Sequence, residues 1–343
     1  MKDNKKHKKA EYGILITGLI ILLAATCVIA LCAGQYSVSV PEVIKILASR
    51  FVNVTKTWSN TAEGVVFTLR LPRMIGAVLV GSALSLSGAA YQGVFKNPLV
   101  APDLLGVSSG ACVGASVAIL LHLNSFGVQA MAFVAGILAV GLTLFIPRLI
   151  KNTNMTMLVL SGIIVKGIMD SVMGIIKYVA DPETELQSIT YWQLGSLTKV
   201  LPRDLFAVGP VIIATSVIIF LLRWRINILS LGDREAKTLG VSVTVVRNFI
   251  IICATLLTAS AVCISGTIGW IGLVIPHFAR MLTGPDNTKA IPASILMGAI
   301  FMVAIDTLAR ALTSVELPLS ILTGIIGAPF YIIILARQRM KLS

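Results

Sequence analysis

Long apolar runs separated by short polar segments form the dominant pattern of this chain. A run of about 20 apolar residues can cross a bilayer as a helix, and shorter broken runs occur where protein surrounds them. The pattern therefore predicts an all-α polytopic membrane protein with about ten transmembrane helices. Their expected ranges are 12–33, 74–95, 104–121, 128–146, 156–179, 205–222, 248–264, 267–282, 291–309 and 318–336.

Composition supports this class and excludes others. Hydrophobic residues make up 56% of the 343 residues and charged residues only 13%, which excludes an ordinary soluble protein. The net charge of +13 does not indicate nucleic-acid binding, because the basic residues lie between the apolar runs without interleaved aromatics. The cysteines lack metal-ligand spacing and are interpreted as small apolar residues, so neither a metal nor a cofactor is expected. They are Cys27, Cys32, Cys112, Cys253 and Cys263.

The distribution of Lys and Arg predicts the orientation. With the amino terminus inside, the inner segments hold 18 of the 28 basic residues, as the positive-inside rule requires. The start of the chain resembles the charged region of a signal peptide, but 12–33 is long enough to span and has no convincing cleavage site. We therefore expect a cytoplasmic start (1–11), a membrane domain (12–336) and a cytoplasmic tail (337–343).

Two outer segments are longer than simple turns. The first, 34–73, contains apolar residues at helical spacing over 38–51, which predicts a helix along the membrane surface. The second, 181–204, carries Tyr191 and Trp192 and predicts a half-helix anchored at the outer interface.

The polar stretch 223–247 is the longest interruption in the second half of the chain. Asp233 is a candidate N-cap, Glu235 lies in the first turn, and Gly240 is a candidate helix stop. These signals predict a short capped cytoplasmic helix. A simple connection between two spans needs no caps, so we expect this helix to contact a partner.

The helix at 74–95 carries a stripe of small residues that allows close approach of a neighbouring helix. Gln92 continues this stripe, and it forms either an interhelical hydrogen bond or part of a polar pathway. Asn97 and Pro98 follow at the inner face as a predicted turn. The stripe consists of Ala77, Gly81, Ser85 and Gly88.

Ionisable residues inside the spans are candidates for a pathway. Lys166 and Asp170 lie four residues apart with Lys177 beyond them, and we favour a water-accessible lining over a simple pair. The run 267–282 is short, rich in glycine and expected to be interrupted by Pro276, which is typical of a path or hinge. His277 fits packing or hydrogen bonding better than a proton relay.

Three arginines depart from the positive-inside pattern. Arg70 and Arg73 lie at the outer mouth of 74–95, and Arg310 lies at the outer end of 291–309, where it is also expected to pair with Asp306. Facing outward, they would either dock to carboxylates of an external partner or reach lipid phosphates.

Several chemical motifs are missing from the sequence. It contains no GxxxxGK[ST] phosphate loop, no catalytic triad order and no cluster with metal-ligand spacing. We therefore do not expect an enzyme, and any ATP hydrolysis would come from another subunit.

Seven ordered blocks carry a resemblance to a known family. The chain resembles the FecCD/BtuC-type permease subunits of ABC importers for iron–siderophore complexes, haem and vitamin B12. The match runs from about 69 to 336. The blocks are LRLPR (69–73), QGVFKNPLVAPDLLGVSSGA (92–111), WQLGSL (192–197), LGDREAKTLGV (231–241), GTIGWIGLVIPHFAR (266–280), DTLAR (306–310) and ELPLSILTGIIGAPF (316–330).

The resemblance implies roles for three groups of residues. The first group would form a coupling helix that seats on the ATPase, the second would meet acidic residues of the substrate-binding protein, and the third would form the gate and path. Trp270 and Leu319 depart slightly from the family pattern. The groups are Leu231, Gly232, Asp233, Glu235, Ala236, Leu239 and Gly240; Arg70, Arg73 and Arg310; and Gln92, Asn97, Pro98, Lys166 and Asp170.

The resemblance also implies the function and its partners. The fold would be the type II ABC importer permease in a bacterial cell membrane, with a ferric siderophore as the expected cargo and vitamin B12 or haem as alternatives. Its partners would be a second permease, related or identical, a cytoplasmic ATPase dimer and an extracytoplasmic binding protein. From another class, an ion-coupled secondary transporter would use Lys166, Asp170 and His277 as a relay, and a non-transporting scaffold would show no flux.

Overall fold

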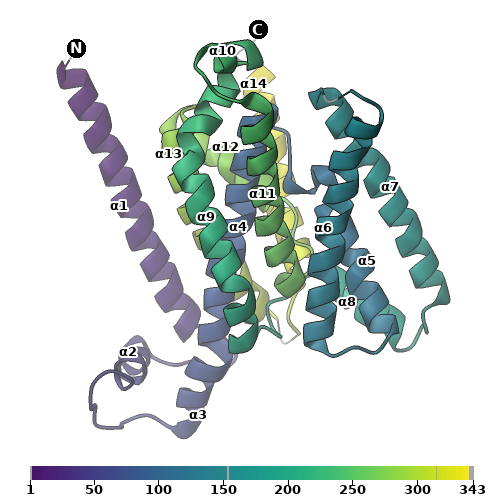
Figure 1. Cartoon of the computed structure of the whole chain (residues 1–343). Coiled ribbons are helices and arrows are strands. Elements are labelled where there is room, and N and C mark those ends of the chain that lie inside the picture. The colour runs from purple at the N-terminus through teal and green to yellow at the C-terminus, as the bar shows by residue number, and fades with distance from the viewer. Residues whose placement is uncertain (1, 153, 314, 340–343) are drawn as a thin grey trace.

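The chain folds into a bundle of helices, most of which run side by side across one slab (Figure 1). The computed structural model describes residues 2–152, 154–313 and 315–339, and all regular structure within these residues is helical. The elements are α1 Lys2–Cys32, α2 Val40–Ala48, α3 Asn60–Gly64, η1 Val65–Arg70, α4 Leu71–Phe95, η2 Pro102–Leu105, α5 Val107–Leu120, α6 Ser125–Leu149, α7 Met155–Val179, α8 Glu185–Leu194, α9 Pro202–Leu231, α10 Asp233–Thr238, α11 Val243–Ser265, α12 Ile271–Thr283, α13 Asn287–Ala311 and α14 Leu319–Arg339.

Among the described residues, seven helices are long and apolar enough to cross a membrane, and three shorter apolar helices accompany them. Each of the ten predicted spans overlaps one of these helices, so the predicted architecture is confirmed. The seven are Ala10–Cys32, Asn60–Phe95, Ser125–Leu149, Met155–Val179, Pro202–Leu231, Val243–Ser265 and Asn287–Ala311, and the shorter ones are Val107–Leu120, Ile271–Thr283 and Leu319–Ile332.

The bundle has two distinct ends. α1 begins and α14 ends at the end where α10 lies, while α2 and α3 lie at the opposite end (Figure 1). We call these the α10 end and the α2 end. At the α2 end, the helix predicted within 38–51 is observed as α2, which packs with Trp58 and Val66 in a small core of its own, and its place at the membrane surface stays a prediction. The predicted half-helix is confirmed as α8.

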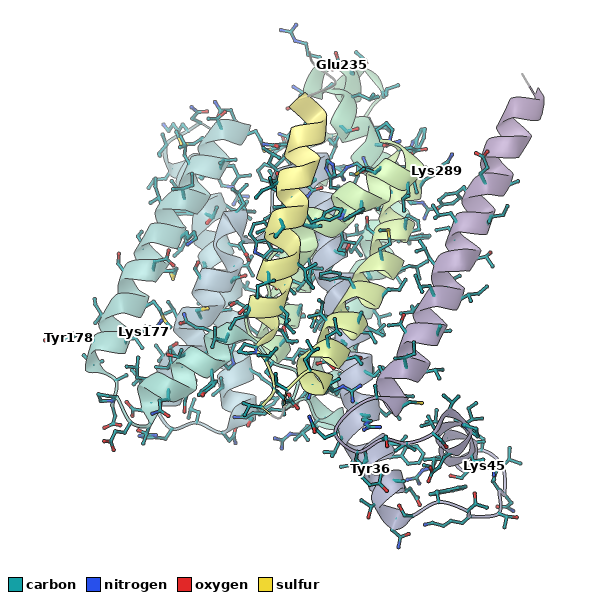
Figure 2. All side chains as sticks on the ribbon, turned by 180° about the vertical axis from the view of Figure 1, so that it is seen from behind. Tyr36, Lys45, Lys177, Tyr178, Glu235 and Lys289 are labelled. Atoms are coloured by element: carbon teal, nitrogen blue, oxygen red, sulfur yellow. The ribbon has the colours of Figure 1, made fainter. Side chains whose placement is uncertain are left out.

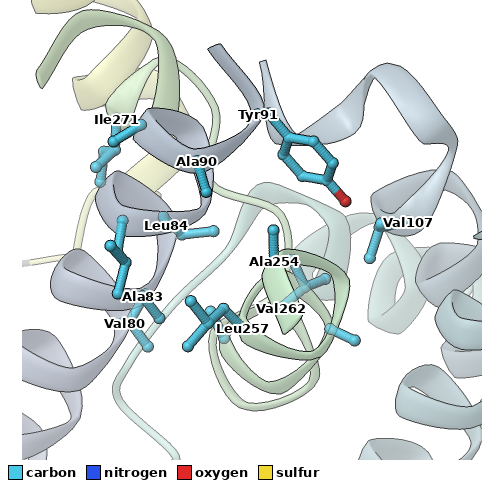
Figure 3. Packing of buried hydrophobic residues seen from close by; sticks show 14 of the residues in the cluster. Val80, Ala83, Leu84, Ala90, Tyr91, Val107, Ala254, Leu257, Val262 and Ile271 are labelled. Atoms are coloured by element: carbon cyan, nitrogen blue, oxygen red, sulfur yellow. The ribbon is translucent and has the colours of Figure 1, made fainter. Parts of the chain in front are cut away.

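Helix α4 lies at the centre of the bundle and packs against α9, α11, α12 and α13. Figure 3 shows Ala83, Leu84 and Tyr91 of α4 opposite Ala254 and Leu257 of α11. The predicted small-residue stripe is confirmed on another side of α4. It allows the backbones of α12 and α13 to approach, and the Ser85 hydroxyl donates to the carbonyl of Ser294 at 2.8 Å.

The position of the helix break differs from the prediction. α12 continues through Pro276, whereas the chain leaves helical geometry at Gly266–Trp270. Gly266 and Trp270 both have positive φ, 68° and 71°, which ends α11 and redirects the chain. The expectation that Pro276 interrupts this helix is therefore wrong. The reason lies in the contacts of Gln92, described below.

Gly88 provides a direct test of close packing at the centre. A Cβ atom added to Gly88 would lie 1.8 Å from the backbone oxygen of Gly272. Neither backbone can move away without disturbing the packing of its helix. We expect Gly88→Ala to reduce the free energy of unfolding by about 1–3 kcal/mol, as overpacked cores do. Thermal unfolding in detergent measures this effect.

Gly174 of α7 is the matched control, because nothing lies within 4 Å of a Cβ added there. Gly174→Ala should leave stability unchanged or raise it, since alanine favours helix. Equal destabilisation by the two substitutions would show that packing against Gly272 is not the cause.

Candidate functional site

Helix α10 forms a short, well-defined projection at the α10 end, and Figure 2 shows Glu235 at its tip. Gly232 precedes the helix with φ 146°, and the Glu235 carboxylate lies where a Cβ of residue 232 would be. The backbone conformation favours glycine, whereas the flexible Glu235 side chain could move away from a larger residue. The N-cap position is Gly232 and α10 starts at Asp233, so the prediction that Asp233 is the N-cap is wrong.

The carboxylate of Asp233 binds two basic side chains and does not cap α10. Its Oδ1 accepts hydrogen bonds from Arg247 Nη2 at 2.7 Å and from Lys96 Nζ at 3.1 Å. The Arg247 hydrogen bond, aided by Lys96, holds the pKa of this carboxyl below its ordinary value despite partial burial. The carboxylate therefore stays charged at neutral pH, and α10 is tied to the ends of both α4 and α11.

Gly240 ends the helix as predicted. With φ 75°, it permits two closing hydrogen bonds, from Gly240 N to Lys237 O at 3.0 Å and from Val241 N to Ala236 O at 3.0 Å. This pattern is a Schellman motif, which satisfies carbonyls that the helix cannot pair itself. A six-residue helix is thus fixed at both ends.

The surface around α10 is uneven and partly apolar. Ala236 is fully buried beneath the helix, whereas Leu231 and Leu239 are 65% and 59% exposed. Two hollows of about 300 and 450 Å³ flank the helix. Lys96, Met155 and Arg247 are among the residues that line the first, and the second lies along 240–245. Apolar side chains exposed beside hollows, at an end of the bundle that also carries charged residues, form a candidate protein-binding surface.

Gln92 connects α4 to α12 inside the bundle. Its Nε2 donates to the carbonyls of Gly272 and Leu273 at 3.3 Å and of Val100 at 3.2 Å. A proline leaves the carbonyl four residues before it without its helical partner, and Gly272 is four before Pro276. Gln92 therefore supplies the missing donor, which explains why α12 continues through Pro276.

The other end of the Gln92 amide accepts a hydrogen bond from Arg280, also on α12. Of the two interpretations of Gln92 left open by the sequence, the interhelical hydrogen bond is observed. Just beyond, Lys96 has φ 52° and Asn97 Oδ1 accepts from Leu99 N at 2.9 Å. The turn predicted at Asn97 and Pro98 is thus confirmed as a compact Asx turn.

Lys166 and Asp170 form a pair on α7 with Nζ and Oδ2 2.7 Å apart. Their side chains are 52% and 55% exposed, although the helix is one of the candidate spans. His277 of α12 is half-buried. Among the described residues, no three His, Cys, Asp or Glu side chains lie together as potential metal ligands.

A buried ion network occupies the α2 end. Arg73 donates to both oxygens of Asp306 at 2.9 and 3.0 Å and to Glu316 at 2.8 Å. Thr198 also contacts Glu316. Burial acts to raise the pKa of Glu316, but hydrogen bonds from Arg73 and Thr198 outweigh it, so this pKa lies below its ordinary value. The expected partner of Asp306, Arg310, lies at a longer 3.9 Å.

Arg70 and Arg310 bind the last turn of α1. Arg70 Nη1 donates to the carbonyl of Leu31 at 2.7 Å, and Arg310 Nη1 donates to that of Ala33 at 2.9 Å. Carbonyls at a helix C-terminus lack intrahelical partners and attract cations. The expectation that Arg70, Arg73 and Arg310 face outward is therefore wrong for this chain, and their docking role stays a prediction.

Sequence reasoning missed the partners that come from distant parts of the chain. Among them are Glu316 and Thr198 beside Arg73, and Arg247 beside Asp233. No local spacing predicts these contacts. The one available signal was that charges near spans need partners.

Comparisons with known proteins agree with this geometry. The model of the FecCD transport family matches residues 21–337. A molybdate import system permease protein of Haemophilus influenzae is 37% identical over 322 residues, 94% of this chain and 95% of that protein. A Helicobacter pylori protein assigned as an iron chelatin transport system permease is 40% identical over 275 residues, 80% of this chain and 83% of that protein.

A solved structure also matches over most of the length. It shows a transporter assigned to the metal-chelate type of ABC transporters in an inward-facing conformation. The TM-score is 0.85 at 35% identity, covering 95% of this chain and 99% of that one. The residues matched by the family model, 21–337, include α10 as well as the spans.

Proposed function

The chain belongs to the FecCD transport family, and we propose that it is the permease subunit of an ATP-binding cassette importer whose cargo is a ferric siderophore. A single observation carries the coupling part of the proposal. The chain presents a short helix, α10, capped at both ends and flanked by the exposed Leu231 and Leu239 and by two hollows. We infer that the α10 end, with both termini, faces the cytoplasm of a bacterial cell, as its basic segments favour.

In this proposal α10 seats in a groove of a separate ATPase subunit. Leu231 and Leu239 supply apolar contact, and the exposed Glu235 supplies charge. The bonds from Asp233 to Lys96 and Arg247 would transmit movement of α10 to α4 and α11. Packed helices that shift as rigid units are a common way to turn binding into a conformational change.

A second permease, related or identical, would cover α7 and enclose the path. The half-exposed Lys166 and Asp170 support this, because charged groups on a spanning helix are costly in contact with lipid. Asn97 and Pro98 would form the gate at the cytoplasmic mouth, and Gln92 would hold the gate loop to α12.

At the α2 end, we infer that an extracytoplasmic binding protein docks over the network of Arg70, Arg73 and Arg310. Because Arg70 and Arg73 are buried and Arg310 is half-buried, they would act by maintaining the shape of the surface and by their net positive charge. A partly exposed Glu316 covers Arg73.

The siderophore assignment rests on the family and on the iron chelatin relative, while the molybdate relative shows that cargo varies among similar proteins. A large chelate also needs weak, distributed contacts, since tight binding would prevent release. The test is uptake by the assembled importer of a labelled ferric siderophore, haem, vitamin B12 and molybdate. Preferred uptake of the siderophore is expected, and preferred uptake of another cargo would overturn the assignment.

A further inference from the structure

Three helices bring polar side chains together beside α1 at the α10 end. The Tyr12 hydroxyl of α1 donates to the carbonyl of Lys289 on α13 at 3.3 Å. Lys289 Nζ lies 5.7 Å from the centre of the Tyr12 ring. Asn227 of α9 donates to Asp286 at 2.9 Å, and Arg223 lies one helical turn before Asn227, on the part of α9 beside the start of α13. Figure 2 shows Lys289 on the side of the bundle that faces α1.

The two cations of this cluster have no carboxylate within 4 Å among the described residues. Arg223 Nη1 donates to the carbonyl of Phe220 at 3.0 Å, and its guanidinium lies over the Phe220 ring at 3.8 Å. Arg223 and Lys289 are both only partly exposed. Each lies one turn from the contact between Asn227 and Asp286 that joins α9 to α13, and two half-buried cations on neighbouring turns favour an anion beside them.

The carboxylate of Asp286 lies near this cluster but already accepts hydrogen bonds from other groups. Its Oδ1 accepts from Thr288 N at 2.9 Å, Thr288 Oγ1 at 2.7 Å and Asn227 Nδ2 at 2.9 Å. It caps α13 and does not neutralise Arg223 or Lys289 directly. The helix start that it caps adds partial positive charge to the same place.

The surroundings are those of a membrane interface. On α1, Ile14 follows Tyr12 and is 73% exposed, and on α9 Trp224 follows Arg223 and is 63% exposed. Tryptophan and basic residues at the end of a span mark the headgroup level, and exposed apolar residues beyond it face acyl chains. The first nine residues of α1 add five lysines just before Tyr12.

We propose that Arg223 and Lys289, beside the Tyr12 ring, bind the phosphate of an anionic phospholipid, whose acyl chains lie along the exposed apolar side of α1. Basic pockets between transmembrane helices at headgroup level bind such lipids. The lipid would lie beside the direct contact between α1 and α13. This inference does not depend on the cargo or on ATP coupling.

The test measures binding of phosphatidylglycerol to the purified full-length chain in phosphatidylcholine nanodiscs. Each basic residue near the surface contributes about fivefold in affinity, so Arg223→Gln/Lys289→Gln should bind roughly 25-fold more weakly. The control is Arg148→Gln/Lys151→Gln, which removes the same two charges from exposed positions at the end of α6. Its affinity should equal that of the native chain.

A second variant is expected to gain affinity, a result that misfolding cannot produce. Asp286→Asn keeps a good N-cap residue but removes the negative charge, so it should bind phosphatidylglycerol more tightly, by about fivefold. Inorganic phosphate, added at the same concentration as phosphatidylglycerol, should not displace the lipid, because it has no acyl chains. Equal loss in the control pair, no gain in Asp286→Asn, or competition by phosphate alone would overturn the proposal.

Discussion

Leu239→Arg is expected to reduce ATP-driven uptake by about tenfold or more without unfolding the chain. Leu239 is 59% exposed, so the substitution breaks no internal packing. In the proposed complex it would bury an unpaired charge against the ATPase, and a disrupted hot spot typically costs 2 kcal/mol or more, about a thirtyfold loss in affinity. Glu235→Lys, which reverses an exposed charge on α10, should act in the same direction.

The measurement is uptake together with ATP hydrolysis in proteoliposomes. Hydrolysis stimulated by the loaded binding protein should fall along with uptake, while the basal activity of the ATPase subunit remains. Leu149→Arg is the control, because Leu149 is 70% exposed at the same end but lies on α6. Normal coupling in Leu239→Arg, or equal loss in the control, would show that α10 is not the coupling surface.

The second large effect is expected in the ion network of the α2 end. Asp306→Ala leaves the buried Arg73 with only the partly exposed Glu316, and breaking a buried pair typically costs about 3–5 kcal/mol. Glu316→Gln should cost much less, since its side chain is 40% exposed. Thermal unfolding of the purified chain in detergent should therefore give Asp306→Ala a much lower melting temperature than Glu316→Gln. Equal melting temperatures would contradict a buried network.

The same region tests docking. Arg70→Glu and Arg73→Glu should weaken association with the substrate-binding protein and reduce its dependence on salt. Because both arginines also hold the fold together, melting temperature must be measured in parallel. If docking is unchanged in a folded variant, these arginines have a structural role only. The hydrogen bonds from Arg70 and Arg310 to carbonyls at the end of α1 are an example of such a role.

The residues that the sequence placed correctly are those governed by local rules. Apolar runs located the spans, and Gly240 predicted the end of α10, because a left-handed turn needs glycine. The small-residue stripe of α4 was predicted for the same reason, since helical spacing alone decides which residues share a face. These features depend on neighbours within a few turns.

The errors concern contacts between distant segments. Asp233 looks like an N-cap locally, but Arg247 and Lys96 compete for its carboxylate. Pro276 looks like a helix break, but Gln92, far away in sequence, supplies the missing donor. The outward assignment of Arg70 likewise ignored the unpaired carbonyls at the end of α1. In each case tertiary partners outweigh a local preference.

Uptake by proteoliposomes tests the coupling of this permease to a separate ATPase most directly. The chain is reconstituted with its partner permease, and labelled ferric siderophore is offered on its binding protein, with or without the ATPase subunits and ATP. We predict uptake only when both ATPase and ATP are present, because the sequence contains no phosphate-binding loop of its own. Uptake that persists without them would contradict the importer mechanism and favour an ion-coupled carrier.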